Sequence, residues 1–227
     1  MSQKEYLLST RFNLNYNKNV IYLLIFIVEV IALFFSSRLM TKSLSFLPIN
    51  VISFLFLPGI IVHELSHLLF ASLLFVPAGE IEFMPKIEGQ SIKLGSVSIG
   101  KTDPIRRFLI GVSPFIFGVL VISAVLYFTK SINVPLYVNL LIFYTLFVIG
   151  NTMFSSQKDM EGALVLLILI AILSGALFFS GARIPQEFFT IISSKGNSLS
   201  QIDYFLPIVI ALDLFIFFLG TRNNYRR

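Results

Sequence analysis

Ile61-Val62-His63-Glu64-Leu65-Ser66-His67-Leu68-Leu69-Phe70 is an apolar stretch that carries the pattern His-Glu-x-x-His. Residues four apart on a helix lie on one face, one turn above the other. His63 and His67 can therefore offer two imidazole nitrogens to one metal ion, and Glu64 lies close enough to accept a proton from a metal-bound water. These two are also the only histidines of the chain. The stretch predicts a helix built around a metal site.

The same residues have a simpler interpretation. A histidine on an apolar face is often a hydrogen-bonded core residue, and a short motif also occurs by chance. Here two imidazoles and a carboxylate fall within five residues of a segment that has the composition of a lipid-buried helix. Ionisable groups at such depth are costly and usually functional. We therefore favour the metal site.

The 227-residue chain has the composition of a membrane protein. It is 56% hydrophobic and 13% charged, whereas about a quarter of the residues in soluble domains are charged. Several apolar runs approach the roughly 20 residues that a helix needs to cross a bilayer. We expect an all-α polytopic membrane protein with a single domain over residues 1–227. The absence of cysteine excludes disulfides, thiolate ligands and a cysteine nucleophile.

Six apolar segments are expected to cross the membrane as helices. They cover about residues 20–35, 51–75, 104–128, 135–154, 163–180 and 204–220. Asp103-Pro104 is typical of a helix start. The polar residues 1–19 are followed by no small-residue cleavage site, so we interpret them as a cytoplasmic lead-in and not as a signal peptide.

Residues 79–103 differ from the rest of the chain because apolar and polar side chains alternate around Glu88-Gly89. This period of two around a glycine turn predicts a β-hairpin, with an irregularity at Gly95-Ser96. The segment is too polar to cross lipid, and an open sheet edge cannot face hydrocarbon. We expect the hairpin at the membrane surface or against the helices.

The six-span map divides the basic residues unevenly between the two sides of the membrane. Of the 17 Lys and Arg residues, about twelve fall on the side of the termini. By the positive-inside rule, we expect a multi-pass protein of the cell membrane whose termini and active-site opening are cytoplasmic. In such a chain, the net charge of +5 reports orientation and does not indicate nucleic-acid binding.

A catalytic zinc site needs three protein ligands and an open position. Since the chain has no cysteine and both histidines are already used, the third ligand should be a carboxylate. The map sets aside seven acids in surface segments or on the far face: Glu5, Glu80, Glu82, Glu88, Asp103, Glu187 and Asp203.

Four acids remain as candidates for the third ligand. Asp159 and Glu161 follow the fourth span at the depth of the motif, in the polar run 155–162. Asp159 also suits the cap of the fifth helix. Glu29 and Asp213 lie within spans, where a carboxylate commonly pairs with another group of the bundle. The residues alone leave the choice open.

The order of these parts resembles the site-2 protease family of intramembrane zinc metalloproteases. That family has His-Glu-x-x-His on one membrane helix and, two helices later, the pattern Asn-x-x-Pro-(four residues)-Asp-Gly. Asn151 and Asp159 have the same spacing, two spans after the motif. The resemblance covers about residues 51–162. Phe154 stands where the family has Pro, Met160 stands where it has Gly, and no soluble substrate-binding domain is present.

The resemblance implies a function and a role for each residue. It implies one zinc ion per chain, held by His63, His67 and Asp159, with Glu64 as the catalytic base. Asn151 would position the substrate or stabilise the oxyanion. The substrate would be a peptide bond in or near the transmembrane segment of another membrane protein, as in regulated intramembrane proteolysis.

Two alternatives stay open. The departures at Phe154 and Met160 are compatible with a non-catalytic pseudoprotease that retains the metal and binds a membrane partner. A transporter that uses Glu29 and Asp213 for ions is a third class. Against it, the sequence contains no inverted repeat.

Overall fold

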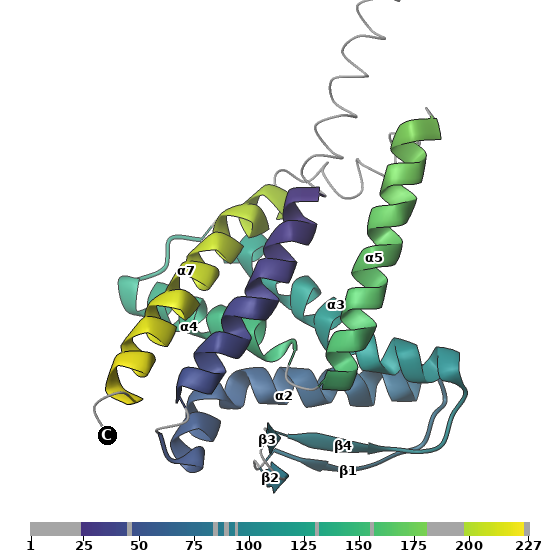
Figure 1. The fold of residues 1–227 in the computed structure, drawn as a ribbon, viewed down its shortest axis with the longest axis horizontal. Helices are drawn as coiled ribbons and strands as arrows, with labels where there is room; N and C mark the ends of the chain where they lie inside the picture. The colour runs from purple at the N-terminus through teal and green to yellow at the C-terminus, as the bar shows by residue number, and fades with distance from the viewer. Residues whose placement is uncertain are drawn as a thin grey trace, which may run out of the picture.

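The computed structural model describes residues 24–44, 47–83, 86–88, 91–93, 95–129, 132–154, 157–180 and 198–224. In 86–88, 91–93, 157–160, 162–163, 174, 177–180, 198–201, 203 and 223–224 the backbone alone is described. The predicted cytoplasmic lead-in, most of the loop before the last span, and the side chain of Asp159 lie outside these residues. The described chain is mostly helical, with a small antiparallel β segment (Figure 1).

Six helices are described. They are the N-terminal helix Leu24–Ser43, α2 Ile49–Leu73, α3 Pro104–Thr129, α4 Leu136–Thr152, α5 Gln157–Ser180 and α7 Ser198–Asn224. Four apolar stretches among them are long enough to cross a membrane: Leu24–Ser43, Ile49–Leu73, Pro104–Thr129 and Tyr204–Arg222. Those of α4 and α5, Leu136–Thr152 and Leu164–Leu173, are shorter. The predicted membrane-helix architecture is therefore supported for four of the six segments.

The N-terminal helix continues to Ser43, beyond its predicted end near residue 35. Arg38 lies over the ring of Phe34, 5.2 Å from its centroid, which covers an apolar side chain with a charged one. Further along, Thr41 Oγ1 donates to Ser37 O at 2.8 Å. The polar side chains therefore bond within the helix and do not end it.

The N-terminal helix and α7 run parallel. Ser36 Oγ donates to Asp213 Oδ2 at 2.8 Å. Seven residues further along both helices, a Cβ added to Gly220 would lie 2.8 Å from Ser43 O. Six successive crossings would make the first and last helices antiparallel. The six described helices are therefore not six successive crossings, and the map on which both termini share one side is not supported.

α2 runs across the direction of the N-terminal helix, α5 and α7 (Figure 1). It ends at a turn in which Phe75 has a φ of 56°, a left-handed conformation that is unusual for a residue other than glycine. Phe75 N–H donates to Ser72 O at 3.1 Å, and Val76 N–H donates to Ala71 O at 2.8 Å. This closing pattern of a helix C-terminus sends the chain back along α2 into the hairpin.

The predicted hairpin is present as two successive pairs of strands. β1 Ala78–Glu82 pairs with β4 Ser96–Ile99, and β2 Lys86–Glu88 pairs with β3 Ser91–Lys93, both antiparallel. The β1–β4 register shifts between Ala78 and Ile81, so the extra residue lies in β1. At the predicted irregularity, Gly95 lies outside both strands.

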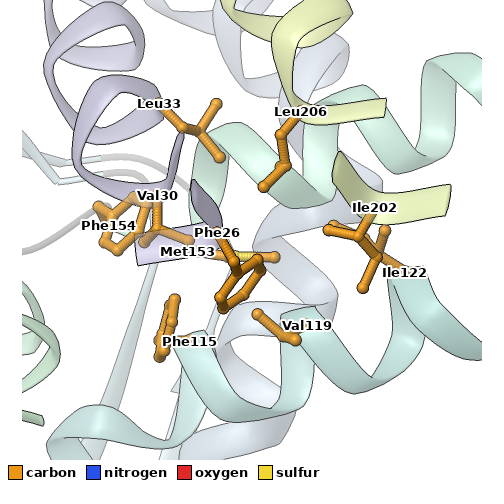
Figure 2. Close-up of a pocket in the computed structure, with 10 residues that line it drawn as sticks. All are labelled: Phe26, Val30, Leu33, Phe115, Val119, Ile122, Met153, Phe154, Ile202 and Leu206. Atoms are coloured by element: carbon orange, nitrogen blue, oxygen red, sulfur yellow. The ribbon is translucent and has the colours of Figure 1, made fainter. Parts of the chain in front are cut away.

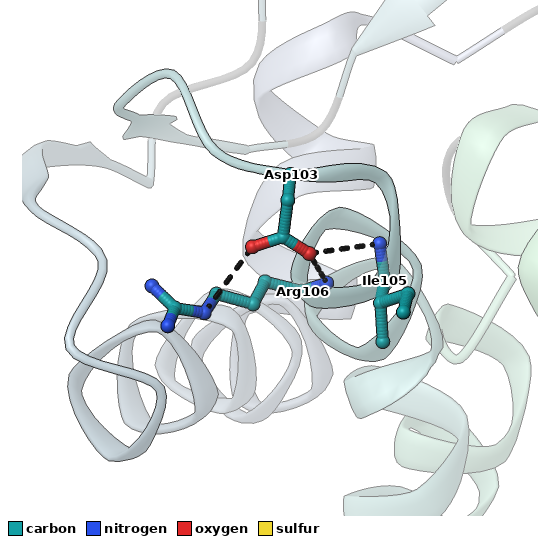
Figure 3. Close-up of polar contacts among 3 residues, drawn as sticks. All are labelled: Asp103, Ile105 and Arg106. Atoms are coloured by element: carbon teal, nitrogen blue, oxygen red, sulfur yellow. Dashed lines mark hydrogen bonds and ion pairs between the residues drawn. The ribbon is translucent and has the colours of Figure 1, made fainter.

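α3 begins where Asp103-Pro104 predicted a helix start (Figure 3). Asp103 Oδ1 accepts the backbone N–H groups of Ile105 at 3.1 Å and Arg106 at 3.0 Å. Oδ2 lies 3.2 Å from Arg106 Nε. The N–H of Arg106, followed by its guanidinium charge, lowers the pKa of Asp103 below the ordinary 3.8. Asp103 is therefore an ionised N-cap that fixes the start of α3.

A core of apolar side chains joins the N-terminal helix, α3, α7 and the end of α4. Phe154 packs between Phe34, 5.6 Å away, and Phe115, 5.9 Å away, as measured between ring centroids. A cavity of about 10 Å³ remains beside Phe154 (Figure 2). Its lining is entirely apolar, with Val30 and Leu206 on facing helices, so it offers no partner to a water molecule. The core is dry at this point.

Candidate metal centre

α2 brings the two histidines of the motif together, as the spacing predicted. Nε2 of His63 and Nε2 of His67 lie 3.3 Å apart. The exposed fraction is 4% for His63, 8% for His67 and 4% for Glu64. The histidine pair and the neighbouring carboxylate are therefore buried, in a helix long and apolar enough to cross a membrane.

The separation of the two nitrogens fits a shared zinc ion. An imidazole nitrogen lies about 2.0–2.1 Å from zinc, and two such ligands at tetrahedral positions are about 3.3 Å apart. The observed 3.3 Å equals this value. When no metal is bound, the same distance suits an N–H···N hydrogen bond between the rings.

α3 supplies a hydrogen-bond partner that orients His67. Pro114 has no N–H, so it cannot donate to the carbonyl of Ile110 four residues earlier. His67 Nδ1 lies 2.8 Å from this oxygen, and Ser113 Oγ donates to it at 2.7 Å. Since a carbonyl oxygen only accepts, Nδ1 carries the proton, and Nε2 presents its lone pair towards His63. Metal-ligating histidines typically have such a partner.

Two serines let α2 and α3 approach each other closely at this point. Ser66 Oγ donates to His63 O at 2.6 Å and lies 3.4 Å from Ser113 Oγ. Both serines are 0% exposed. Their small side chains place the backbone of α3 within reach of His67, and their hydroxyls find partners without water.

Glu64 lies against the hairpin. A Cβ added to Gly95 would lie 2.6 Å from Glu64 Oε1 and 3.0 Å from the Cγ2 of Ile60. A side chain at this position would collide with the carboxylate, so glycine allows the backbone to pass directly over it. The backbone just before β4 therefore covers the carboxylate that the motif predicts to be the base.

The structure separates the four candidate third ligands. Among the described side chains, no three His, Cys, Asp or Glu residues form a group that could hold a metal ion. Glu29, Glu161 and Asp213 therefore do not complete the histidine pair. Asp159 is the third residue of α5, but its side chain lies outside the described residues.

α4 and the turn that follows it lead the chain past the motif towards α5. Thr152 and Val148 of α4 pack on Gly59, one turn before His63, where an added Cβ would lie 2.7 Å from Val148 O. Met153 then packs on α3, and its Cε would lie 2.6 Å from a Cβ added to Gly118.

Phe154 continues this path along α3. It stacks on Phe115 at 5.9 Å, and Phe115 is two residues beyond Ser113, the neighbour of His67. α5 begins three residues after Phe154. The chain that leads into α5 thus packs first on α2, which carries the histidine pair, and then on α3.

Asn151, predicted to act on the substrate, is 7% exposed at the end of α4. Its Nδ2 donates to Phe147 O at 3.0 Å, and its side chain also interacts with the carboxylate of Asp213. Asp213 is held by Ser36, so it has the partner inside the bundle that the sequence indicated. The catalytic role of Asn151 stays a prediction.

Comparison with protein-family models, with curated proteins and with solved structures finds no match for this chain. The resemblance to the site-2 protease family therefore depends on the chain's own residues, and above all on the motif and the spacing from Asn151 to Asp159.

Proposed function

We propose that this chain is an intramembrane zinc metalloprotease that hydrolyses a peptide bond in or near the transmembrane segment of a membrane protein. The observation that carries this proposal is the pair of Nε2 atoms 3.3 Å apart, buried on a membrane-length helix next to a glutamate. Two imidazoles oriented in this way, with a carboxylate beside them, are the parts that metal-assisted hydrolysis needs.

The zinc ligands in this proposal are His63, His67 and Asp159. Three observations support Asp159. The other three candidate acids do not join the pair among the described residues. Residues 152–154 pack on Gly59 and then on α3 beside the histidine contact. Asp159 follows within five residues, in the first turn of α5.

The chain's own groups divide the chemistry between them. A bound zinc ion would lower the pKa of a water to about 7 and polarise the scissile carbonyl. Glu64 accepts the proton of the attacking water and passes it to the leaving amine. The bond from His67 Nδ1 to Ile110 O keeps that ring in the ligating tautomer. Burial of all three motif residues excludes bulk water.

The hairpin suits a substrate that has unwound from a helix. A helical segment hides its backbone, so it must open before hydrolysis. β1 and β4 form a two-stranded sheet, and an edge of such a sheet can pair with an extended peptide. Because Gly95, the residue before β4, lies on Glu64, a peptide beside β4 would pass the base.

Replacement of Glu64 with Gln tests the proposal. The purified Glu64→Gln variant should keep its zinc, because Glu64 is not a ligand, and should lose cleavage of a membrane-tethered substrate by about 100-fold or more. Glu80→Gln is the matched control, because Glu80 is exposed on β1; it should keep both. Cleavage by Glu64→Gln at the wild-type rate would refute the mechanism.

The same experiment distinguishes the alternative. A wild-type chain that binds one zinc ion but cleaves no membrane-tethered substrate, under conditions where the protein stays folded, would indicate a pseudoprotease that holds a membrane partner. A chain that binds no zinc would contradict both interpretations.

A further inference from the structure

A second buried polar group lies between the N-terminal helix, α4 and α7. This Asp213 cluster consists of Ser36, Asn151 and Asp213, one residue from each helix, with exposed fractions of 2%, 7% and 0%. Ser36 Oγ donates to Asp213 Oδ2 at 2.8 Å, and the side chain of Asn151 interacts with the same carboxylate. Three segments far apart in the sequence therefore bring polar side chains to one carboxylate.

Two oxygens of this cluster have no hydrogen-bond donor among the described residues. They are Oδ1 of Asp213 and Oδ1 of Asn151, both buried. A buried polar atom without a partner is costly, and an uncompensated buried carboxylate more so. Both atoms are acceptors, so the partner they need is a hydrogen-bond donor or a cation.

The surrounding helices are apolar or direct their charges elsewhere. Val209, one turn before Asp213, is 0% exposed. Arg38, the closest basic residue to Ser36 in the sequence, lies over the Phe34 ring. Glu29 lies seven residues before Ser36, about 10 Å away along the helix.

We propose that the Asp213 cluster binds one sodium ion. The site offers a carboxylate, an amide oxygen and a hydroxyl, which are ligands for a hard cation, and no imidazole or thiolate. One negative charge is balanced by one monovalent cation, whereas a divalent ion would leave a net positive charge in a low-dielectric interior. Intramembrane sites built from carboxylate and other oxygen ligands on several helices are typical of coupling ions.

The ion would fix the end of α4. Asn151 lies in the last turn of α4, and the next residue, Thr152, packs on Gly59 one turn before His63. A cation held between α4, α7 and the N-terminal helix therefore stabilises the helix end from which the chain continues towards Asp159. The sodium site can be tested apart from the proposed protease activity, because its test measures folding.

The test is thermal unfolding of the purified full chain in detergent, in NaCl or in choline chloride at equal concentration. Sodium should raise the wild-type Tm by about 3 °C, saturably, because an ion that binds only the folded state stabilises it. Asp213→Asn, which keeps the shape and removes the charge, should abolish the sodium-dependent shift. Glu161→Gln, an exposed acid on α5, is the control and should keep the full shift.

A second variant keeps the proposal testable if Asp213→Asn does not fold. Ser36→Ala removes one oxygen and leaves the charge, so it should raise the sodium concentration at half-saturation several-fold. Equal Tm values for the wild type in sodium and choline would overturn the site, and so would a sodium shift that persists in Asp213→Asn. A Tm that rises as the pH falls but is insensitive to sodium would assign the two oxygens to a shared proton, which also overturns it.

Discussion

The histidine pair and the Asp213 cluster are two buried polar groups of the same helical bundle, and they are built differently. His63 and His67 come from adjacent turns of one helix, so their meeting is dictated by the helical repeat. Ser36, Asn151 and Asp213 come from three helices and meet because those helices pack together. A group of the first kind can be found in a sequence, whereas a group of the second kind needs the fold.

The two groups also differ in which of their atoms have partners. His67 has a partner on each ring nitrogen, Ile110 O at Nδ1 and His63 at Nε2. The Asp213 cluster has two acceptor oxygens without a described donor. We conclude that the protein scaffold already orients the histidine pair, whereas a bound cation or proton would complete the Asp213 cluster.

The largest effect is expected where the histidine pair depends on a distant residue. Asp159→Ala should reduce the zinc content of the purified protein from about one per chain to near zero after exchange against a mild chelator, because two imidazoles alone bind weakly. Elemental analysis measures the ratio. Glu161→Ala, two residues further along α5, is the control and should keep its zinc. Full zinc occupancy in Asp159→Ala would show that Asp159 is not a zinc ligand.

The second effect tests whether the scaffold orients His67. Pro114→Ala restores an N–H that can donate to Ile110 O and compete with His67 Nδ1. Zinc affinity should fall about tenfold, in the range that loss of a partner of a metal-ligating histidine costs. The Tm should not fall, because Ala favours a helix more than Pro does. Competition with a chelating dye measures the affinity.

Pro207→Ala is the matched control for that experiment. Pro207 also lies inside a helix, but on an exposed position of α7, so its replacement should leave zinc affinity unchanged. Equal affinities in wild type and Pro114→Ala would mean that the carbonyl of Ile110 does not orient the ring. The histidine pair would then not be oriented by the protein scaffold, and it would no longer differ from the Asp213 cluster in this respect.

A third effect concerns the hairpin. Gly95→Ala places a methyl group 2.6 Å from Glu64 Oε1, which is too close, so the carboxylate must move. We expect kcat to fall about tenfold with zinc content unchanged, because a misplaced base slows proton transfer but is not a ligand. Gly111→Ala is the control, since nothing lies within 4 Å of a Cβ added there. Loss of zinc in Gly95→Ala would instead make the hairpin part of the metal site.

The parts of the fold that the sequence predicted well are those with a local cause. The motif helix, the start of α3 and the β-hairpin each follow from a repeat or a cap within a few residues. The N-terminal helix extended past its predicted end because Arg38 and Thr41 find partners within the helix, which hydropathy alone does not reveal. The six-span map is supported for four segments only, and the parallel packing of the N-terminal helix and α7 is a tertiary contact that hydropathy does not reveal.

The same division holds at the candidate site. Helical spacing was sufficient to predict the face that His63 and His67 share. The contact of Ile110 O with His67 is partly visible in the sequence, because a proline within a helix frees the carbonyl four residues earlier. Which side chain donates a hydrogen bond to that carbonyl depends on how α2 packs on α3. Gly95 carried no such sign, since any glycine in a hairpin suits a turn or a bulge as well.

The smallest effect is expected at a purely local feature, the cap of α3. Asp103 is exposed and holds its helix start through two backbone N–H groups and Arg106. Its pKa is lowered in the folded protein, so its stabilising contribution is complete above the ordinary 3.8 and is lost as the pH falls through the lowered value. Asp103→Ala should lower the Tm slightly at neutral pH, and the difference from wild type should vanish in strong acid. A difference that persisted down to about pH 2 would mean that the cap does not depend on the charge of Asp103. The start of α3 would then be fixed by its packing on α2. Like the Asp213 cluster, it would depend on contacts between helices, and the local sequence around Asp103 would not be sufficient to explain where the helix begins.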